Sequence, residues 1–365
     1  MSLVRLRSNP ISYAAGRQAF QLNFLPRRGP RNGRMVVEKI WVEFSGTVTT
    51  PGGVTVVPRD IPTLFKLLEV RDAAGVRRNF TGVQAWIMGQ HYLERRMPDL
   101  PATIPAAAGT AVTIRVPILF RYDAHAFDLR DYCMPVDDLL DGGLVAITMP
   151  AVSDIASTGG AITSITAATY QLIVECREDT DVQLYCRDAV DFINQSAAAA
   201  LDLPVLDNAL IDLFLHIAGT VGGGAVVTTV TDCTVPAYRI DALTRSQLKE
   251  LYLAEHDAPR VLADGYVYND VALPIITSQR DAKWKDHFRV EGSLIGRFTT
   301  SAAVGQFLFR YMTPKDPKIM GNTLAANNLG RDAVPKVKTA GKSAASVGPW
   351  GALGAMARWK LGRSA

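Results

Sequence analysis

The fold is decided by two similar stretches, IWVEFSGTVTTPGGVTVV at residues 40–57 and LFLHIAGTVGGGAVVTTV at residues 213–230. They align without a gap at an offset of 173, and six of the 18 positions are identical. The first six pairs, such as Trp41 and Phe214, are mostly hydrophobic in both copies. Because a glycine-rich turn follows a β-rich run, each copy predicts a hairpin, with Gly46 and Gly219 at equivalent strand positions.

Further matches follow in the same order along the chain. Residues 116–118, VPI, match residues 273–275, LPI, at an offset of about 157. Residues 170–174 match residues 305–309 at an offset of about 135. A drifting offset is expected where loops differ in length while the strands are kept. The ordered series therefore predicts two copies of one β-sandwich.

The rest of the body has the pattern of short strands between turns. Apolar or alternating runs occur at residues 36–48, 111–121, 144–149, 170–175 and 306–312. Helical patterns are few, at residues 61–70, 83–95, 188–201 and 243–255. This distribution is typical of a sandwich or barrel with short helical inserts. We predict an all-β chain with one sandwich at residues 35–178 and a second at residues 179–313.

Basic residues concentrate at the two ends of the 365-residue chain. Residues 1–34 contain seven arginines and no acid, and residues 333–365 contain six basic residues and no acid. Since the whole chain has a net charge of +4, residues 35–332 carry −9. We interpret residues 1–34 as a basic N-terminal arm and residues 314–365 as a basic C-terminal tail. Such ends either contact a polyanion or are solvated.

The predicted membrane or polyanion contact draws on both ends. It comprises Arg5, Arg7, Arg17, Arg27, Arg28, Arg31, Lys336, Lys338, Lys342, Trp350, Arg358, Trp359, Lys360 and Arg363. Indole rings beside cations suit a lipid headgroup interface, so an anionic membrane is the first choice of partner. Non-specific contact with genomic DNA is the second, because no aromatic stacking platform is evident.

Catalytic and ligand-binding motifs are missing from the sequence. The five histidines are isolated, and no HxH, HExxH, GxSxG or GxxxxGK[ST] motif occurs. Acidic clusters at residues 137–141 and 175–191 offer oxygens that suit calcium, but their spacing does not match the DxDxDG loop. We interpret both clusters as solvated loops. We expect no enzyme activity, no metal site and no cofactor.

The sequence also bears on the compartment of synthesis. No uncharged apolar stretch of about 18 residues occurs, and no apolar run of signal-peptide length precedes Arg17. The four cysteines are widely spaced, unlike a disulfide scaffold. We therefore expect the chain to be made in a cytoplasm.

Taken together, the tandem sandwiches, the arginine-rich start, the basic tail and the absence of catalytic motifs resemble one viral family. It is the double jelly-roll major capsid proteins of non-tailed, membrane-containing double-stranded DNA bacteriophages, of the corticovirus and tectivirus-like lineage. The resemblance implies two tandem jelly rolls with basic terminal arms. It also implies a virion structural protein that forms homotrimers, each a pseudo-hexameric capsomer, and tiles an icosahedral shell over an internal membrane.

The partners implied by this resemblance are neighbouring capsomers, minor capsid or membrane proteins, and the lipid beneath the shell. Two other classes remain open. A viral spike or attachment protein is also β-rich and oligomeric, although basic arms have little use in an adhesin. A carbohydrate-active sandwich enzyme would need a facing pair of carboxylates, for which Asp286 and Glu291 are the candidates.

Overall fold

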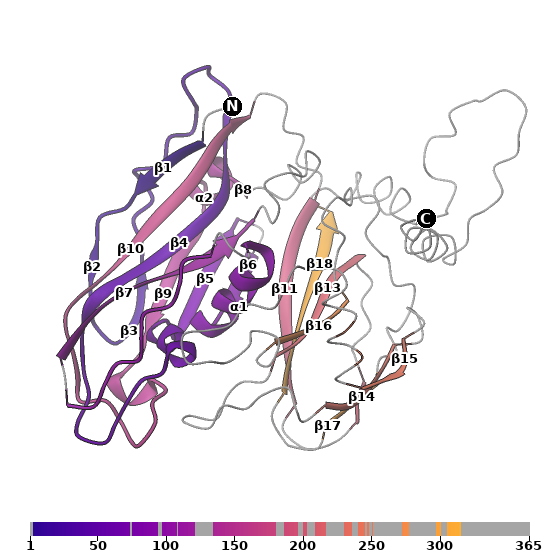
Figure 1. The fold of residues 1–365 in the computed structure, drawn as a ribbon. Coiled ribbons are helices and arrows are strands. Elements are labelled where there is room, and N and C mark those ends of the chain that lie inside the picture. Colours follow the sequence, from indigo (N-terminus) through magenta and orange to yellow (C-terminus); the bar gives the residue numbers. More distant parts are fainter. Residues whose placement is uncertain are drawn as a thin grey trace, which may run out of the picture.

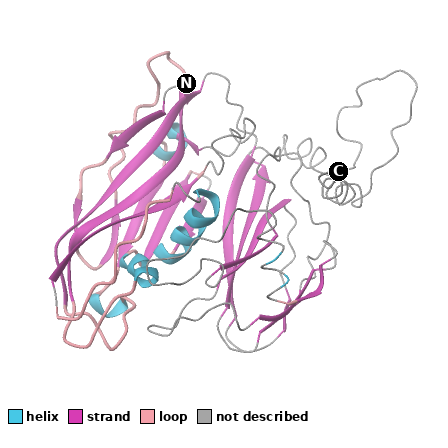
Figure 2. Cartoon of the chain, viewed as in Figure 1, coloured by secondary structure: helices cyan, strands magenta, loops and turns pink. Residues whose placement is uncertain are grey.

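The computed structural model describes most of the first half of the chain and the strand framework of the second. The described residues are 3–73, 75–93, 97–107, 109–120, 134–179, 186–195, 200–202, 209–216, 230–235, 240–244, 247, 250, 272–276, 297–300 and 305–314. The predicted C-terminal tail therefore lies outside them, except for Pro314. Among the described residues, strands dominate both halves, with few helices between them (Figures 1 and 2).

Two antiparallel sheets form the first half. One has the strand order β1-β10-β4-β7, with the short strands β2 and β8 added to β10 and β4. The other has the order β3-β9-β5-β6. The strands are β1 (Leu3–Arg7), β2 (Ile11–Ser12), β3 (Gly16–Ala19), β4 (Arg34–Thr49), β5 (Leu67–Asp72), β6 (Gly75–Phe80), β7 (Gly109–Leu119), β8 (Met134–Pro135), β9 (Leu144–Met149) and β10 (Ser164–Asp179).

The second half also has two antiparallel sheets. Their strand orders are β11-β18-β13-β16 and β12-β17-β14-β15. The strands are β11 (Cys186–Gln195), β12 (Ala200–Asp202), β13 (Ala209–His216), β14 (Val230–Val235), β15 (Ile240–Leu243), β16 (Ala272–Ile276), β17 (Arg297–Thr300) and β18 (Gly305–Pro314).

The two halves share one topology. The order β1-β10-β4-β7 corresponds to β11-β18-β13-β16, and β3-β9-β5-β6 corresponds to β12-β17-β14-β15. Apart from the added strands β2 and β8, the chain also visits the two sheets in the same sequence in each half. Two four-stranded antiparallel sheets connected in this way form a jelly roll. The fold is a double jelly roll, as predicted; we call residues 3–179 the first roll and residues 186–314 the second roll.

Strand register confirms the sequence repeat residue by residue. Directly paired residues form one row across three strands of each roll: Ile173, Trp41 and Pro117 in the first, and Leu308, Phe214 and Pro274 in the second. The three offsets between these rows are 135, 173 and 157, which are those of the sequence matches. The repeat therefore marks equivalent strands, although Gly219 itself lies outside the described residues.

The core of the first roll lies between its two sheets. Alternate residues of β4 point inward, so Val42 and Phe44 are fully buried while Glu43 on the other face is not. Tyr170 packs edge-on against Phe44 and Phe65, with ring centroids 5.2 and 5.7 Å away. Its hydroxyl donates a hydrogen bond of 2.6 Å to the carbonyl of Leu64. Burial raises the pKa of Tyr170 above its ordinary value, so the phenol stays neutral.

Among the described residues, the helices differ in place from those that the sequence patterns predict. The helix expected at residues 83–95 is confirmed as α1 (Gly82–Leu93). Residues 61–70 instead begin in the 3-10 helix η1 (Pro58–Leu64) and continue into β5. The helix expected at residues 188–201 is wrong, because that segment supplies β11 and the start of β12, whose pairing with β18 and β17 outweighs local propensity.

Two further short helices are α2 (Val136–Leu140) and the 3-10 helix η4 (Val152–Asp154). None of the helices among the described residues is long and apolar enough to cross a membrane.

A matching helix start follows the equivalent strands β6 and β15. Before α1, the Thr81 hydroxyl accepts a hydrogen bond from the Gln84 backbone N–H, and the Gln84 side chain accepts one from the Thr81 N–H. Thr244 and Gln247 make the same reciprocal pair after β15. This is a capping box in both rolls. Most of the helix predicted at residues 243–255 lies outside the described residues.

The hairpin predicted at residues 40–57 is wrong, and most of the hairpin predicted at residues 213–230 lies outside the described residues. After β4 the chain does not fold back on that strand, and Thr55 and Val56 instead bridge to Thr158 and Ile104. In the second roll, β13 and β14 belong to different sheets. The cause is the jelly-roll connection, in which the chain crosses from one sheet to the other at this point.

A glycine in β4 offers a test of this packing. A Cβ atom on Gly46 would lie 2.5 Å from the Cβ of Ala168 and 2.8 Å from its Cα on the paired strand β10. We expect Gly46→Ala to destabilise the first roll by roughly 1–3 kcal/mol, measured as a lower midpoint of thermal unfolding. The control is Gly52→Ala, since a Cβ there has nothing within 4 Å. Equal midpoints for the two variants would contradict this account.

Candidate polyanion-binding surface

The predicted N-terminal arm is built into the first roll. β1 and β2 pair with β10, and β3 pairs with β9, so residues 3–19 extend both sheets. Alternation of apolar and basic residues in β1 lets Leu6 pack against the core while Arg5 and Arg7 stay exposed. The first roll therefore begins at Leu3, and not at residue 35.

Arg5 is held by a buried carboxylate. Its Nε donates to Glu175 Oε1 at 2.9 Å, and Glu175 also receives Lys39 Nζ at 3.0 Å and the indole N–H of Trp41 at 3.1 Å. The Glu175 side chain is only 5% exposed. Burial alone would raise the pKa of Glu175, but Lys39, the indole donor and Arg5 together hold that pKa below its ordinary value. The group is a charged anchor between β1, β10 and β4.

Arg17 on β3 has a similar partner in the other sheet. Its Nη2 lies 2.9 Å from Glu69 Oε2 on β5, and Arg71 pairs with the same carboxylate. Burial works against ionisation of Glu69, yet the two guanidinium groups hold its pKa below the usual range. The charge of Arg17 is therefore compensated inside the roll.

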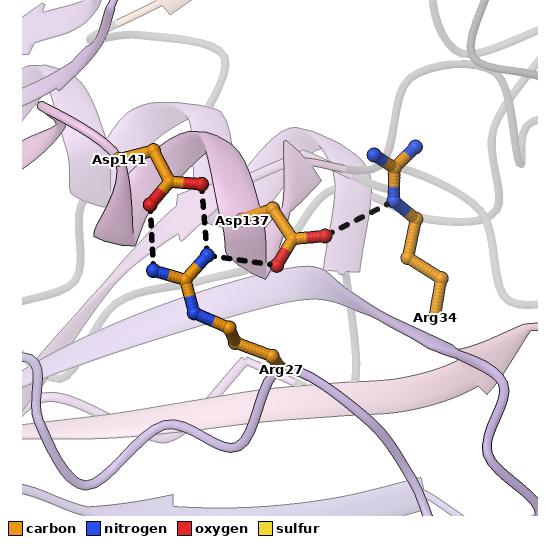
Figure 3. Close-up of polar contacts among 4 residues, drawn as sticks. All are labelled: Arg27, Arg34, Asp137 and Asp141. Atoms are coloured by element: carbon orange, nitrogen blue, oxygen red, sulfur yellow. Dashed lines mark hydrogen bonds and ion pairs between the residues drawn. The ribbon is translucent and has the colours of Figure 1, made fainter.

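Figure 3 shows the third anchor, between the chain that leads into β4 and the acidic helix α2. Arg27 reaches Asp141 with two nitrogens, at 2.8 and 2.6 Å, and reaches Asp137 at 3.2 Å. Arg34 Nε lies 3.3 Å from the other oxygen of Asp137. A bidentate guanidinium-carboxylate pair fixes orientation as well as charge. The hydrogen bonds of Arg27 hold the pKa of Asp141 below its ordinary value.

The loop between Arg27 and Arg34 is held through its backbone N–H groups, which donate hydrogen bonds to a carboxylate of β10. Glu178 Oε1 on β10 accepts hydrogen bonds from the N–H of Arg31 at 2.8 Å and from the N–H of Gly33 at 2.7 Å. Asn32 adopts the left-handed conformation at φ 61, which asparagine tolerates. The acidic clusters predicted to be solvated loops thus include Asp137, Asp141 and Glu178 as anchors for the basic segment.

The structure therefore divides the predicted contact residues. Arg5, Arg17 and Arg27 are ion-paired within the first roll. Arg7, Arg28 and Arg31 are exposed, and no ion pair of their side chains occurs among the described residues. The predicted contact residues of the C-terminal tail, from Lys336 to Arg363, lie outside the described part of the chain.

The partner of the first arginines is the acidic body itself, which the sequence pattern did not predict. The available signal was the opposite charge of residues 1–34 and 35–332. No group of three metal-ligating side chains occurs in the part of the chain that the structure describes. At Asp137 and Asp141 the oxygens that could hold a cation are engaged by arginine instead.

Comparison with known proteins supports the fold. No family model and no curated protein matches the chain. A chain in the atomic structure of Sulfolobus Turreted Icosahedral Virus is 11% identical, with a TM-score of 0.55 and coverage of 90% of this chain and 97% of that one. The crystal structure of the STIV major capsid protein is also 11% identical, with a TM-score of 0.53 and coverage of 86% and 96%.

A chain of the PBCV-1 virus capsid is 12% identical, with a TM-score of 0.51 and coverage of 86% of this chain and 93% of that one. At such identities the likeness shows the fold. That fold is the double jelly roll of major capsid proteins, and these neighbours are structural proteins of virions, not enzymes.

The Glu175 anchor gives a testable consequence. Glu175→Gln keeps the shape but leaves Lys39 and Arg5 without their carboxylate. We expect a loss of roughly 2–3 kcal/mol in unfolding free energy, below the full cost of breaking a buried pair because both cations retain some access to water. Asp141→Asn removes an exposed carboxylate and is the control, which should lower the unfolding midpoint far less.

The same variant should change the response to acid. Since the pKa of Glu175 is lower in the folded chain, its ionised form stabilises the fold above about pH 4.3, the ordinary value for glutamate. That contribution is lost as the pH falls through the lowered pKa. Unfolding midpoints measured from neutral pH downward should therefore fall less steeply for Glu175→Gln than for the parent chain. Parallel curves would contradict this role of Glu175.

Proposed function

We propose that the chain is the major capsid protein of a virion. The single observation that carries this proposal is the tandem repetition of one jelly roll, with the same strand order and the same Trp41 and Phe214 row in both copies. Solved capsid proteins share this architecture over nearly their whole length. A duplicated roll supplies two similar building blocks per chain, as a shell of repeated contacts requires.

In this proposal three chains form one capsomer. Six rolls then make a pseudo-hexameric unit, and such units tile an icosahedral shell through contacts with neighbouring capsomers and minor capsid or membrane proteins. An internal membrane lies beneath the shell. The chain acts as a structural protein, is made in the host cytoplasm and ends in the virion.

Most residues of the proposed membrane contact belong to the C-terminal tail. In the first roll, the ion pairs of Arg5, Arg17 and Arg27 reduce the charge that residues 1–34 can offer to lipid. The contacts we propose are Arg7, Arg28, Arg31, Lys336, Lys338, Lys342, Trp350, Arg358, Trp359, Lys360 and Arg363. Each basic residue near an anionic surface contributes about 1 kcal/mol, so a few are enough to matter.

Assembly is the direct test of the capsid role. We expect the purified chain to sediment as a trimer at high concentration, and electron microscopy to show particles with pseudo-sixfold outlines. A capsid subunit should bury more than the roughly 1,600 Å² of a standard interface, because it contacts several neighbours. A stable monomer at every concentration would overturn the proposal.

Vesicle binding tests the membrane contact separately. We expect the full chain to co-sediment with vesicles that contain anionic lipid at low salt and to be released at high salt. A chain that ends after residue 332 should bind much less. The matched control replaces Trp350 and Trp359 with alanine and keeps all charges, which separates the aromatic part from the electrostatic part. Equal binding by the full and shortened chains would contradict a membrane role for the tail.

A further inference from the structure

The loop that precedes β4 contains the only Asn-Gly sequence in the chain, Asn32-Gly33. An asparagine followed by glycine is prone to spontaneous deamidation, because the next backbone nitrogen can attack the side-chain amide and glycine has no Cβ to hinder the approach. Asparagine is accordingly one of the thermolabile residues. Asn32 is exposed, so water can reach its side chain, whereas Gly33 is buried. The sequence and the exposure of Asn32 therefore mark a reactive position.

The turn around Asn32 has a defined conformation. The Asn32 N–H donates to the Gly29 carbonyl at 2.9 Å, and the Gly29 N–H donates to the Gly33 carbonyl at 3.0 Å. With Asn32 at φ 61, this is a type I turn followed by a left-handed residue, which is a common three-residue hairpin loop. Closing a ring between the Gly33 nitrogen and the Asn32 side chain requires rotation about the Cα–C bond of Asn32, out of this conformation. The turn must therefore open before the two reacting atoms can meet.

Glu178 on β10 engages the attacking nitrogen itself. Its Oε1 accepts the Gly33 N–H at 2.7 Å and the Arg31 N–H at 2.8 Å, one on each side of Asn32. The Gly33 nitrogen becomes nucleophilic only when its proton leaves. Loss of that proton would place a negative nitrogen against a carboxylate, which like-charge repulsion disfavours. The same two hydrogen bonds fix the backbone around Asn32, so they also oppose the rotation that ring closure needs.

The two ends of the hairpin are pinned as well (Figure 3). Arg27 is bound to Asp141 and Asp137, and Arg34 is bound to the other oxygen of Asp137. The bidentate pair with Asp141 fixes the orientation of Arg27 as well as its charge. The loop between these arginines is therefore restrained both at its base and at its tip.

We propose that Asn32 is a site of spontaneous deamidation whose reaction is suppressed in the folded chain by the carboxylate of Glu178 and by the left-handed turn. In the reaction, the Gly33 nitrogen loses its proton to solvent and bonds to Cγ of Asn32. The bond from Cγ to Nδ2 breaks, and Nδ2 takes up a proton from solvent and leaves as ammonia. Water then opens the succinimide ring to aspartate or isoaspartate. Either product adds one negative charge between Arg31 and Arg34.

The reaction would weaken the loop as a basic surface. Residues 1–34 hold seven arginines and no acid, so the product would be the first carboxylate among them. It would directly follow Arg31, whose side chain is exposed. Isoaspartate would also lengthen the backbone that presents its N–H groups to Glu178. Protection by Glu178 thus preserves both the charge and the shape of the loop.

Incubation of the full chain at mildly alkaline pH tests the proposal. We expect aspartate and isoaspartate at position 32, measured by mass spectrometry of peptic peptides, to form about tenfold faster in Glu178→Ala than in the parent chain. Glu178→Gln keeps an acceptor oxygen and should react more slowly than Glu178→Ala. Asn23, which is exposed but precedes Phe24, is the internal control and should react equally slowly in all variants. A parental rate at Asn32 in Glu178→Ala would overturn the role of Glu178.

Gly46→Ala controls for a general loss of stability. It is expected to destabilise the first roll while leaving Glu178 in place, so its rate at Asn32 should match that of the parent chain under conditions in which both remain folded. Equal acceleration in Gly46→Ala and Glu178→Ala would assign the effect to global unfolding and would remove the specific role of Glu178.

A second measurement covers the case in which Glu178→Ala does not fold. The parent chain is incubated in buffer and in guanidinium chloride at the same pH. We expect Asn32 to react about tenfold faster in the denatured chain, since neither the turn nor the carboxylate then restrains it. Absence of reaction at Asn32 in the denatured chain overturns the site itself, and equal rates in the two states overturn its protection by the fold.

Discussion

The antiparallel pairing of β4 with β10 is the interaction on which the first roll depends. These two 16-residue strands form the centre of their sheet, and every other strand of that sheet pairs with one of them. On the inner face of the pair, Phe44 and Tyr170 pack edge to face. The Tyr170 hydroxyl donates a hydrogen bond to the carbonyl of Leu64, at the end of η1 and shortly before β5 of the second sheet. On the outer face, the same register brings Lys39 to Glu175. A slip of one residue would exchange these two faces, which is why the register is so strongly specified.

Charge compensation is the second organising feature. The excess of arginine at the start of the chain is matched by carboxylates at the positions where the segment adds to the sheets. Glu69, Glu175 and Asp141 each receive an arginine from the first 34 residues; one carboxylate lies in each sheet, and Asp141 directly follows α2. The basic residues 1–34 thus help to hold the N-terminal strands in the two sheets of the first roll. Only the part of their charge that is not ion-paired is left for external partners.

The sequence by itself determined the all-β class, the duplication and the equivalence of the Trp41 and Phe214 strands. It could do so because strand residues are constrained by pairing and by packing in the core, so their pattern is kept in both copies while the lengths of the loops differ. Only the tertiary structure decided where those strands pair, that the glycine-rich stretches lead from one sheet to the other, and that residues 188–195 form a strand despite a helical pattern. It also decided that Arg5, Arg17 and Arg27 face carboxylates 52 to 170 residues away. Pairing between distant segments depends on register and topology, and no local pattern of residues carries that information.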